Sequence, residues 1–372
     1  MRYIKPHYYD KFSCLADQCP DTCCAGWAIM IDEESLKYYS RVKGPFGNRL
    51  KNSVNWEDGS FLQYERRCSF LNEENLCDLY RELGPDALCD TCRRYPRHVE
   101  EFEGLRELSL SLSCPEAARM ILNCREPVRF LWEETDEEDE EFEDMDPLLF
   151  TQLEDARDVM LKILQDRSAF VDERLQIIRC MARDIQNEID KEEYFTIDKT
   201  INKYNKKENN FLLKEKTDKK DFMQKCRDFQ VFRKMETLRE TWRKFLDDTW
   251  EHLFLAGEES YETLRAEFEA DFLGEKEREE AWECMREQLA VFFLYTYFCG
   301  AVYDGYIYAK AALAAFSVEW LKEFSMARWL ENGKQLELQE VTELSWKYAR
   351  EVEHSDVNLG ILMEWLDEEM QE

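Results

Sequence analysis

Cysteines are the residues of this chain whose number and spacing point most clearly to chemistry. Ten of the 14 cysteines lie in the first third of the 372-residue sequence. Within this region several neighbouring cysteines are separated by four residues or fewer, as in Cys14-x4-Cys19-x3-Cys23-Cys24 and Cys89-x2-Cys92. Thiols held so close together lose their protons readily to a metal. Thiolate ligation of a metal is therefore the first chemistry that the sequence predicts.

Nine of these cysteines are the candidate ligands: Cys14, Cys19, Cys23, Cys24, Cys68, Cys77, Cys89, Cys92 and Cys114. A structural zinc ion takes four ligands, and a 4Fe-4S cluster takes one thiolate per iron. Nine candidates exceed one such site. The sequence therefore leaves two alternatives open, either two metal sites or one site accompanied by structural or resolving thiols.

The compartment supports metal ligation over disulfide bonds. The residues after Met1 lack the apolar segment of a secretory signal peptide, so we expect a cytoplasmic protein, whose thiols stay reduced. The longest apolar run, Leu289 to Tyr303, has about 15 residues, whereas a membrane span needs about 20. The formal net charge of -31 repels nucleic acids and anionic membranes. We therefore expect neither as a partner.

Three cysteine segments resemble a known group of bacterial proteins, the CxxCxxCC zinc- or iron-chelating domain. Residues 19–27 read CPDTCCAGW, residues 67–80 read RCSFLNEENLCDLY, and residues 92–97 read CRRYPR. Cys89 and Cys114, with their neighbours, match a branch of that group, the flagellin lysine N-methylases. The resemblance covers residues 1 to about 125. The pattern of the broader group implies seven of the nine cysteines as ligands: Cys14, Cys19, Cys23, Cys24, Cys68, Cys77 and Cys92.

The resemblance implies a function and its cofactors. A flagellin lysine N-methylase would transfer a methyl group from S-adenosylmethionine to the ε-amines of flagellin lysines, with a 4Fe-4S cluster, or alternatively zinc, on the cysteines. Arg93, Arg94 and Arg97 follow Cys92 and are candidates to bind the carboxylate of S-adenosylmethionine or the cluster sulfurs. The sequence assigns no catalytic residue. The alternative function is a non-catalytic metal-binding, redox or metal-chaperone module.

The elements that must position these residues are predicted to be mainly helical. We expect a cysteine-rich domain of short helices and loops over residues 1–125, an acidic linker over 126–150, and an irregular helical bundle over 151–372. Apolar residues recur at steps of three and four after residue 150, with long helices expected over 221–252, 259–273, 276–299, 302–331, 337–353 and 357–370. A basic, Asn-rich stretch at 196–220 is predicted to be a loop. No Gly-x-Gly-x-x-Gly follows a strand, so a doubly wound methyltransferase fold is disfavoured.

Overall fold

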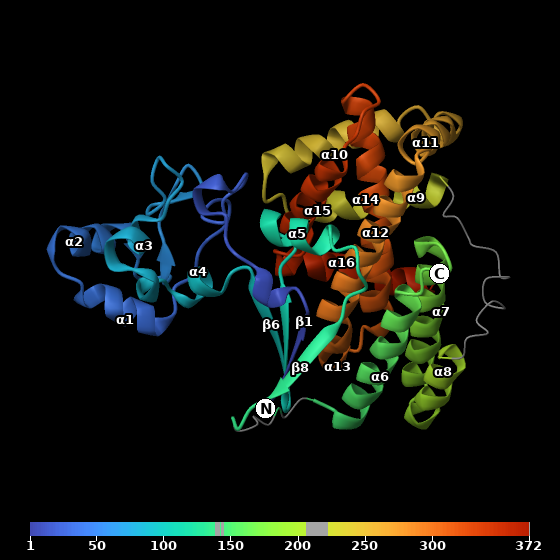
Figure 1. The fold of residues 1–372 in the computed structure, drawn as a ribbon, viewed down its shortest axis with the longest axis horizontal. Coiled ribbons are helices and arrows are strands. Elements are labelled where there is room, and N and C mark those ends of the chain that lie inside the picture. Colours follow the sequence, from blue (N-terminus) through green and yellow to red (C-terminus); the bar gives the residue numbers. More distant parts are fainter. Residues whose placement is uncertain (138–141, 143–144, 206–221, 372) are drawn as a thin grey trace.

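Helices dominate the structure, as the sequence predicts. The structure is a computed structural model that describes residues 1–137, 142, 145–205 and 222–371. Figure 1 shows a small lobe of short elements on one side, a large helical body on the other, and a sheet between them. We call residues 24–94 the cysteine lobe, and residues 147–205 and 222–371 the helical body.

The cysteine lobe is built from short elements around its own apolar core. Its helices and strands are α1 (Glu33–Arg41), α2 (Gly44–Ser53), β2 (Val54–Asn55), β3 (Ser60–Phe61), β4 (Gln63–Tyr64), β5 (Arg67–Cys68), α3 (Asp78–Leu83) and α4 (Asp90–Arg94). Tyr39, Leu50, Phe70, Leu79 and Cys89 are buried together in that core. The core is small for a folding unit, so bound metal is an expected source of additional stability.

A four-stranded sheet joins the lobe to the body, which corrects one expectation. The strands β1 (Arg2–Pro6), β6 (Arg97–Phe102), β7 (Leu105–Leu110) and β8 (Phe130–Glu134) lie in the order β6-β7-β1-β8. β1 pairs in parallel with β7 and antiparallel with β8. Residues 1–125 are therefore not only short helices and loops. Buried apolar and exposed polar residues do not alternate along strand β7, because the charged residues Arg106 and Glu107 are both buried.

The helical body consists of long helices that follow a short helix at the sheet. After α5 (Pro115–Leu122) come α6 (Pro147–Leu164), α7 (Val171–Asp190), α8 (Ile197–Tyr204), α9 (Phe222–Lys234), α10 (Glu240–Leu253), α11 (Glu258–Phe272), α12 (Lys276–Tyr297), α13 (Ala301–Asp304), α14 (Ile307–Glu331), α15 (Leu338–Val352) and α16 (Asp356–Gln371). The helices expected over 259–273, 276–299, 337–353 and 357–370 are confirmed to within a few residues. Residues 147–205 and 222–371 contain no strand.

Three predicted boundaries were wrong. The helix expected over 221–252 is two helices, α9 and α10, because the backbone N–H groups of Glu236 and Leu238 donate to Asn358 and Glu351 instead of continuing the helix. The helix expected over 302–331 breaks at Gly305, whose φ of 77° suits glycine. Part of the loop expected over 196–220 is α8. Residues 206–220 of that loop lie outside the described residues.

The predicted acidic linker contains ordered structure in its described part. β8 occupies Phe130–Glu134 and α6 begins at Pro147, both inside the expected range of 126–150. The Asp146 carboxylate caps α6 by accepting hydrogen bonds from the backbone N–H groups of Leu148 and Leu149 at 2.9 and 3.1 Å. Residues 138–141 and 143–144 of the acidic run lie outside the described residues.

The sheet shares one apolar core with the helical body. Phe102 and Leu110 of the sheet are buried in the same cluster as residues of α6, α12 and α14. The buried Arg157 of α6 donates to Glu107 of β7 at 2.5 Å. The cysteine lobe, by contrast, has a separate core. Across the described residues, no helix combines the length and apolar composition that a membrane crossing requires.

Candidate metal centre and the cavity beside it

Most of the nine candidate cysteines line one cavity where the lobe meets the body. The cavity has a volume of about 840 Å³. Six of the cysteines line it: Cys14, Cys19, Cys23, Cys24, Cys77 and Cys92. The other three, Cys68, Cys89 and Cys114, are buried. The structure thus brings together residues that are up to 100 positions apart in the sequence. Their role as metal ligands stays a prediction.

Five of these thiols, which we call the lobe thiols, belong to the cysteine lobe: Cys24, Cys68, Cys77, Cys89 and Cys92. The Cys68 backbone N–H donates to the Cys24 carbonyl at 2.8 Å, and Cys77 pairs with Leu71 in an isolated bridge. Burial raises the pKa of Cys68 to about 12, and the neighbouring Cys24, Cys77 and Cys89 add to that rise. Cys89, Cys24 and Cys68 likewise raise the pKa of Cys92, so the charges of all five sulfurs affect one another.

The other four, which we call the junction thiols, are Cys14, Cys19, Cys23 and Cys114. Burial raises the pKa of Cys114 to about 11, with contributions from Cys19 and Cys14. Burial also raises the pKa of Cys19, to which Cys14 adds. The Cys19 thiol donates to the carbonyl oxygen of Asp21 at 3.3 Å.

Two pairs of thiols lie close enough to share a proton. A hydrogen bond with Cys23 lowers the pKa of Cys24 to about 7, while the same bond raises the pKa of Cys23. The same holds for Cys89 and Cys92, whose hydrogen bond lowers the pKa of Cys89 and raises the pKa of Cys92. One thiolate in each pair is thereby favoured, and a thiolate is the form that binds metal.

The Cys89 and Cys92 pair is held in place by an aspartate at the start of α1. One carboxylate oxygen of Asp32 caps α1 by accepting from the Ser35 backbone N–H at 2.8 Å, and the other accepts from the Asp90 backbone N–H at 2.9 Å. Burial opposes its ionisation, yet these bonds lower the pKa of Asp32 to about 2. A permanently charged Asp32 therefore ties α1 to the turn that carries both cysteines.

The three arginines proposed for cofactor binding are not equivalent. Arg93 and Arg97 line the cavity, whereas Arg94 does not. Arg93 also donates to the Leu88 carbonyl at 2.7 Å, and Arg94 pairs with Asp90 at 3.4 Å. Arg93 and Arg97 are therefore placed to meet a ligand in the cavity. Arg94 is occupied on the surface, and the cofactor-binding role of all three stays a prediction.

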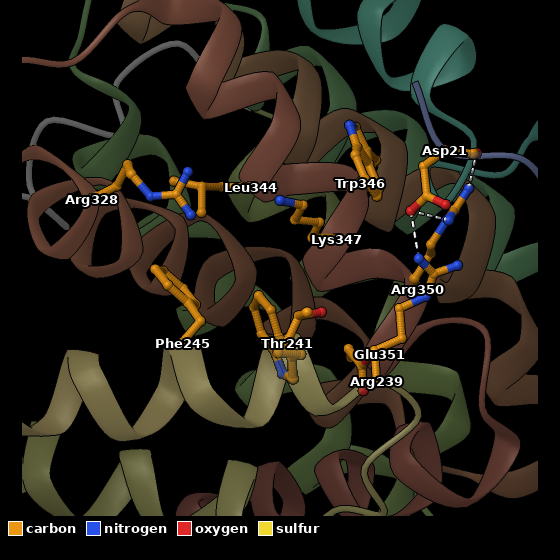
Figure 2. Close-up of a pocket in the computed structure, with 11 residues that line it drawn as sticks. Asp21, Arg239, Thr241, Phe245, Arg328, Leu344, Trp346, Lys347, Arg350 and Glu351 are labelled. Atoms are coloured by element: carbon orange, nitrogen blue, oxygen red, sulfur yellow. Dashed lines mark hydrogen bonds and ion pairs between the residues drawn. The ribbon is translucent and has the colours of Figure 1, made fainter. Parts of the chain in front are cut away.

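An ion-pair cluster that the sequence did not indicate joins the segment between Cys19 and Cys23 to the helical body. Asp21, between Cys19 and Cys23, pairs with Arg350 of α15 at 2.6 Å and with Arg239 at 2.5 Å. Figure 2 shows both arginines reaching the same carboxylate beside a small cavity of about 70 Å³. Arg350, which is 3% exposed, also donates to the carbonyl oxygens of Asp21 at 2.8 Å and Ser113 at 2.7 Å.

Three rings form one wall of the large cavity. His354, which follows α15, lies with its ring centroid 3.9 Å from that of Trp27 and 6.0 Å from that of Tyr95. Burial, aided by the nearby charge of Arg350, lowers the pKa of His354 to about 4. His354 is therefore neutral at physiological pH. No local pattern around His354 could have predicted this position, because its partners lie more than 250 residues away.

All nine candidate ligands are thiols, which bind both iron-sulfur clusters and zinc. Among the described residues, no three Cys, His, Asp or Glu side chains stand close enough together to hold one metal ion. A tetrahedral zinc ion needs all four thiolates on one centre, whereas a 4Fe-4S cluster binds each thiolate through a different iron. A cluster therefore accepts thiols that are farther apart, and the cavity beside them offers room for it.

A protein-family model matches most of the helical body. Residues 157–372 match the family model described as the FliB lysine N-methylase C-terminal domain. This range includes Arg239 and Arg350, which pair with Asp21, and His354, whose ring contacts Trp27.

Curated proteins from Salmonella share part of the sequence. The chain is 32% identical over 128 residues to the lysine-N-methylase of Salmonella typhimurium (strain LT2), which covers 32% of each protein. The flagellar biosynthetic protein FliU of Salmonella muenchen is also 32% identical over 128 residues, covering 32% of this chain and 76% of FliU. The match thus spans about a third of the length of the lysine-N-methylase and about three quarters of FliU. No solved structure matches.

Proposed function

This chain belongs to the flagellin lysine N-methylase (FliB) family, and from that membership we propose that it transfers methyl groups from S-adenosylmethionine to the ε-amines of flagellin lysines. The observation that carries the proposal is that the family's C-terminal domain builds part of the cysteine cavity. His354 lines this cavity and Arg350 holds the loop between Cys19 and Cys23, and both lie in the matched range. A free-standing metal module would not need a second domain in its cavity wall.

The cavity wall suits an incoming lysine. Methyl transfer by displacement needs a neutral amine aligned with the methyl donor and shielded from water. The rings of Trp27 and Tyr95 line the cavity and help to exclude water from it. The neutral His354 adds no positive charge that would repel the lysine side chain. Arg93 and Arg97 are available for the carboxylate of S-adenosylmethionine.

We also propose that the cysteines bind a metal group. The nine cysteines would hold a 4Fe-4S cluster, or zinc in the alternative, and such a cluster would supply a redox-active, Lewis-acidic centre beside the cavity. The net charge of -31 would favour approach of a lysine-presenting protein.

The test is methylation of flagellin by protein purified without oxygen. We expect mass spectrometry to find methyl groups on flagellin lysines when S-adenosylmethionine is present, and none when it is omitted. Trp27→Ala should lower kcat/KM at least about 10-fold, because a misplaced substrate reacts far more slowly. Trp27→Phe, which keeps a ring, should lose less. Trp132→Ala is the matched control, since Trp132 is 68% exposed on β8.

Two outcomes would contradict the proposal. Flagellin that stays unmodified by metal-loaded protein would reject the methylase activity. Reversible metal uptake without any binding of S-adenosylmethionine would instead favour the non-catalytic metal-binding or redox module.

A further inference from the structure

We propose that a chain of three hydroxyl groups carries the proton of the substrate lysine from the large cavity to the carboxyl group of Glu353. The hydroxyls belong to Tyr95, Ser113 and Ser111. The inference rests on the proposed function, because methyl transfer is the step that requires a lysine to lose this proton. A lysine ammonium has a pKa of about 10.4 in water and has no lone pair with which to attack a methyl group.

The three hydroxyl groups form a continuous chain of hydrogen bonds. The hydroxyl oxygen of Tyr95 lies 3.0 Å from that of Ser113, and the Ser113 oxygen lies 2.7 Å from that of Ser111. Ser111 donates to Oε1 of Glu353 at 2.8 Å. All three distances are normal for hydrogen bonds between oxygens. Each hydroxyl can accept one proton and donate another, so the chain can pass a proton along.

The chain leads from the cavity wall into the interior. Tyr95 lines the cavity, and its ring centroid lies 5.3 Å from that of Trp27. Ser113 is fully buried. Glu353 is half-buried as a whole residue, but its Oε2 atom is buried and has no hydrogen-bond partner among the described residues. The chain therefore links a residue of the cavity wall to a carboxyl group that the protein shields from water.

Backbone contacts hold the two serines in place. Ser111 and Ser113 follow directly after β7, and Glu353 follows α15. The Ser111 backbone N–H donates to the carbonyl of Pro96 at 2.7 Å. Arg350 donates to the carbonyl of Ser113, also at 2.7 Å. The end of β7 and the end of α15 are thus joined, and the hydroxyl groups are ordered before any substrate binds.

The carboxyl group of Glu353 is suited to take up a proton and release it again. Burial raises its pKa to about 7, although the hydrogen bond from Ser111 and the nearby His98 oppose the rise. The titratable groups that face Glu353 are His98 of β6, Tyr297 of α12 and Tyr348 of α15. A proton acceptor works best when its pKa lies near the working pH.

The proton transfer needs no further reactant. The lysine ammonium gives a proton to the hydroxyl oxygen of Tyr95, each hydroxyl passes its own proton to the next oxygen, and Oε1 of Glu353 binds the last one. The neutral amine then attacks the methyl group of S-adenosylmethionine. The N–C bond forms while the C–S bond breaks, and the electron pair of the broken bond stays on sulfur. After the product leaves, the Glu353 proton returns through the same hydroxyls to water in the cavity.

Variants that break the chain at three points test the relay in full-length, metal-loaded protein. Tyr95→Phe removes the first hydroxyl and keeps the ring, Ser111→Ala removes the last hydroxyl, and Glu353→Gln removes the proton acceptor. Each should lower the rate of flagellin methylation at about pH 8 at least about 10-fold. Tyr348→Phe is the matched control, because its hydroxyl also bonds to a serine, Ser317, at 3.0 Å but lies outside the chain.

The pH profile separates a proton path from a structural defect. The loss of rate should shrink towards about pH 10, where a lysine loses its proton to water without help. It should also shrink below about pH 7, because Glu353 is then already protonated in the unmodified protein. A variant with a merely structural defect would lose the same fraction of its rate at every pH.

Infrared spectroscopy follows the Glu353 proton without any methylation. The difference spectrum between the unmodified protein and Glu353→Gln isolates this carboxyl group from the others. Its protonated band should fade as the pH rises through about 7. In Ser111→Ala the midpoint should move to higher pH, because the lost hydrogen bond favours the ionised form.

The results distinguish failure of the relay from failure of the proposed function. If the unmodified protein methylates flagellin and the three variants match Tyr348→Phe, or lose the same fraction of rate at every pH, the relay is overturned and the methylase activity stands. Active protein in which the Glu353 band does not titrate near pH 7 would also overturn the relay alone. Unmodified protein that does not methylate flagellin would reject the methylase activity and the relay that rests on it.

Discussion

Arg350 is one of the residues through which the helical body contacts the segment between Cys19 and Cys23. Its guanidinium is buried, pairs with Asp21, and lies 5.7 Å from the ring centroid of Trp27 and 4.8 Å from that of Trp346. A buried arginine needs such a partner, because an unpaired charge in the interior is costly. The pairing places one positive charge where several thiolates are expected.

Glu351, the neighbour of Arg350, carries a prediction about pH. It is 2% exposed, and burial raises its pKa to about 7, although it accepts a hydrogen bond from the Leu238 N–H. The folded protein therefore holds this proton more tightly than the unfolded chain, and the stability it contributes at low pH is lost as the pH rises through about 7. Glu351→Gln should remove that loss.

The measurement is denaturant unfolding of both proteins between about pH 5 and about pH 8. The free energy of unfolding of the variant relative to the unmodified protein should rise by up to about 3 kcal/mol over this range. A difference that stays constant with pH would show that Glu351 does not titrate there.

At the residue scale, the sequence predicted the cysteines but not their partners. Cysteine type and spacing are local signals, so Cys89 and Cys92 could be read as a pair directly. Asp21, Arg350 and His354 carry no local signal, because the first is 329 residues from the second and only folding brings them together. Their roles depend on tertiary contacts that composition and periodicity do not contain.

At the scale of elements, periodicity predicted the helices well and the strands poorly. Helices such as α7 and α15 keep an apolar step of three and four residues over many turns. The sheet depends on the parallel pairing of β1 with β7, which are about 100 residues apart, and on buried charges in β7. The break between α9 and α10 likewise depends on hydrogen bonds to Asn358 and Glu351.

The contact between the sheet and α6 gives a stability prediction. Arg157→Met leaves Glu107, which is 3% exposed, without its charged partner and should cost about 3–5 kcal/mol of unfolding free energy. Adding Glu107→Leu should recover most of that loss, since no unpaired charge remains. Arg2→Met is the matched control, because Arg2 of β1 pairs with Glu154 of α6 in a more exposed position and should cost at most about 1 kcal/mol. Equal losses in the two single variants would contradict this account.

At the scale of the whole molecule, two apolar cores of different size lie side by side. The core of the helical body includes the sheet and α5, whereas the lobe has a core of its own. The sequence predicted a cysteine-rich part and a helical part, but the core of the body reaches across the predicted linker into residues 1–125. Nonlocal strand pairing is the physical reason, because it places β1 on the side of the helices.

The separate cores of the lobe and the body predict how the protein responds to loss of metal. Removing metal with a chelator under reducing conditions should lower hydrogen-exchange protection in the cysteine lobe at least about 10-fold, because bound metal substitutes for a large core there. Protection in α7, α12 and α14 should change little. A uniform loss across lobe and body, or no loss in the lobe, would contradict a metal-stabilised lobe.

The proposed methylase activity is tested most directly by following an isotopically labelled methyl group from S-adenosylmethionine to protein. Full-length, metal-loaded protein is incubated with the labelled donor and flagellin, and peptides are analysed by mass spectrometry. We expect the label on lysine side chains of flagellin, at a rate that falls in Trp27→Ala and not in Trp132→Ala. Absence of label from every flagellin lysine, with donor and metal both present, would contradict it.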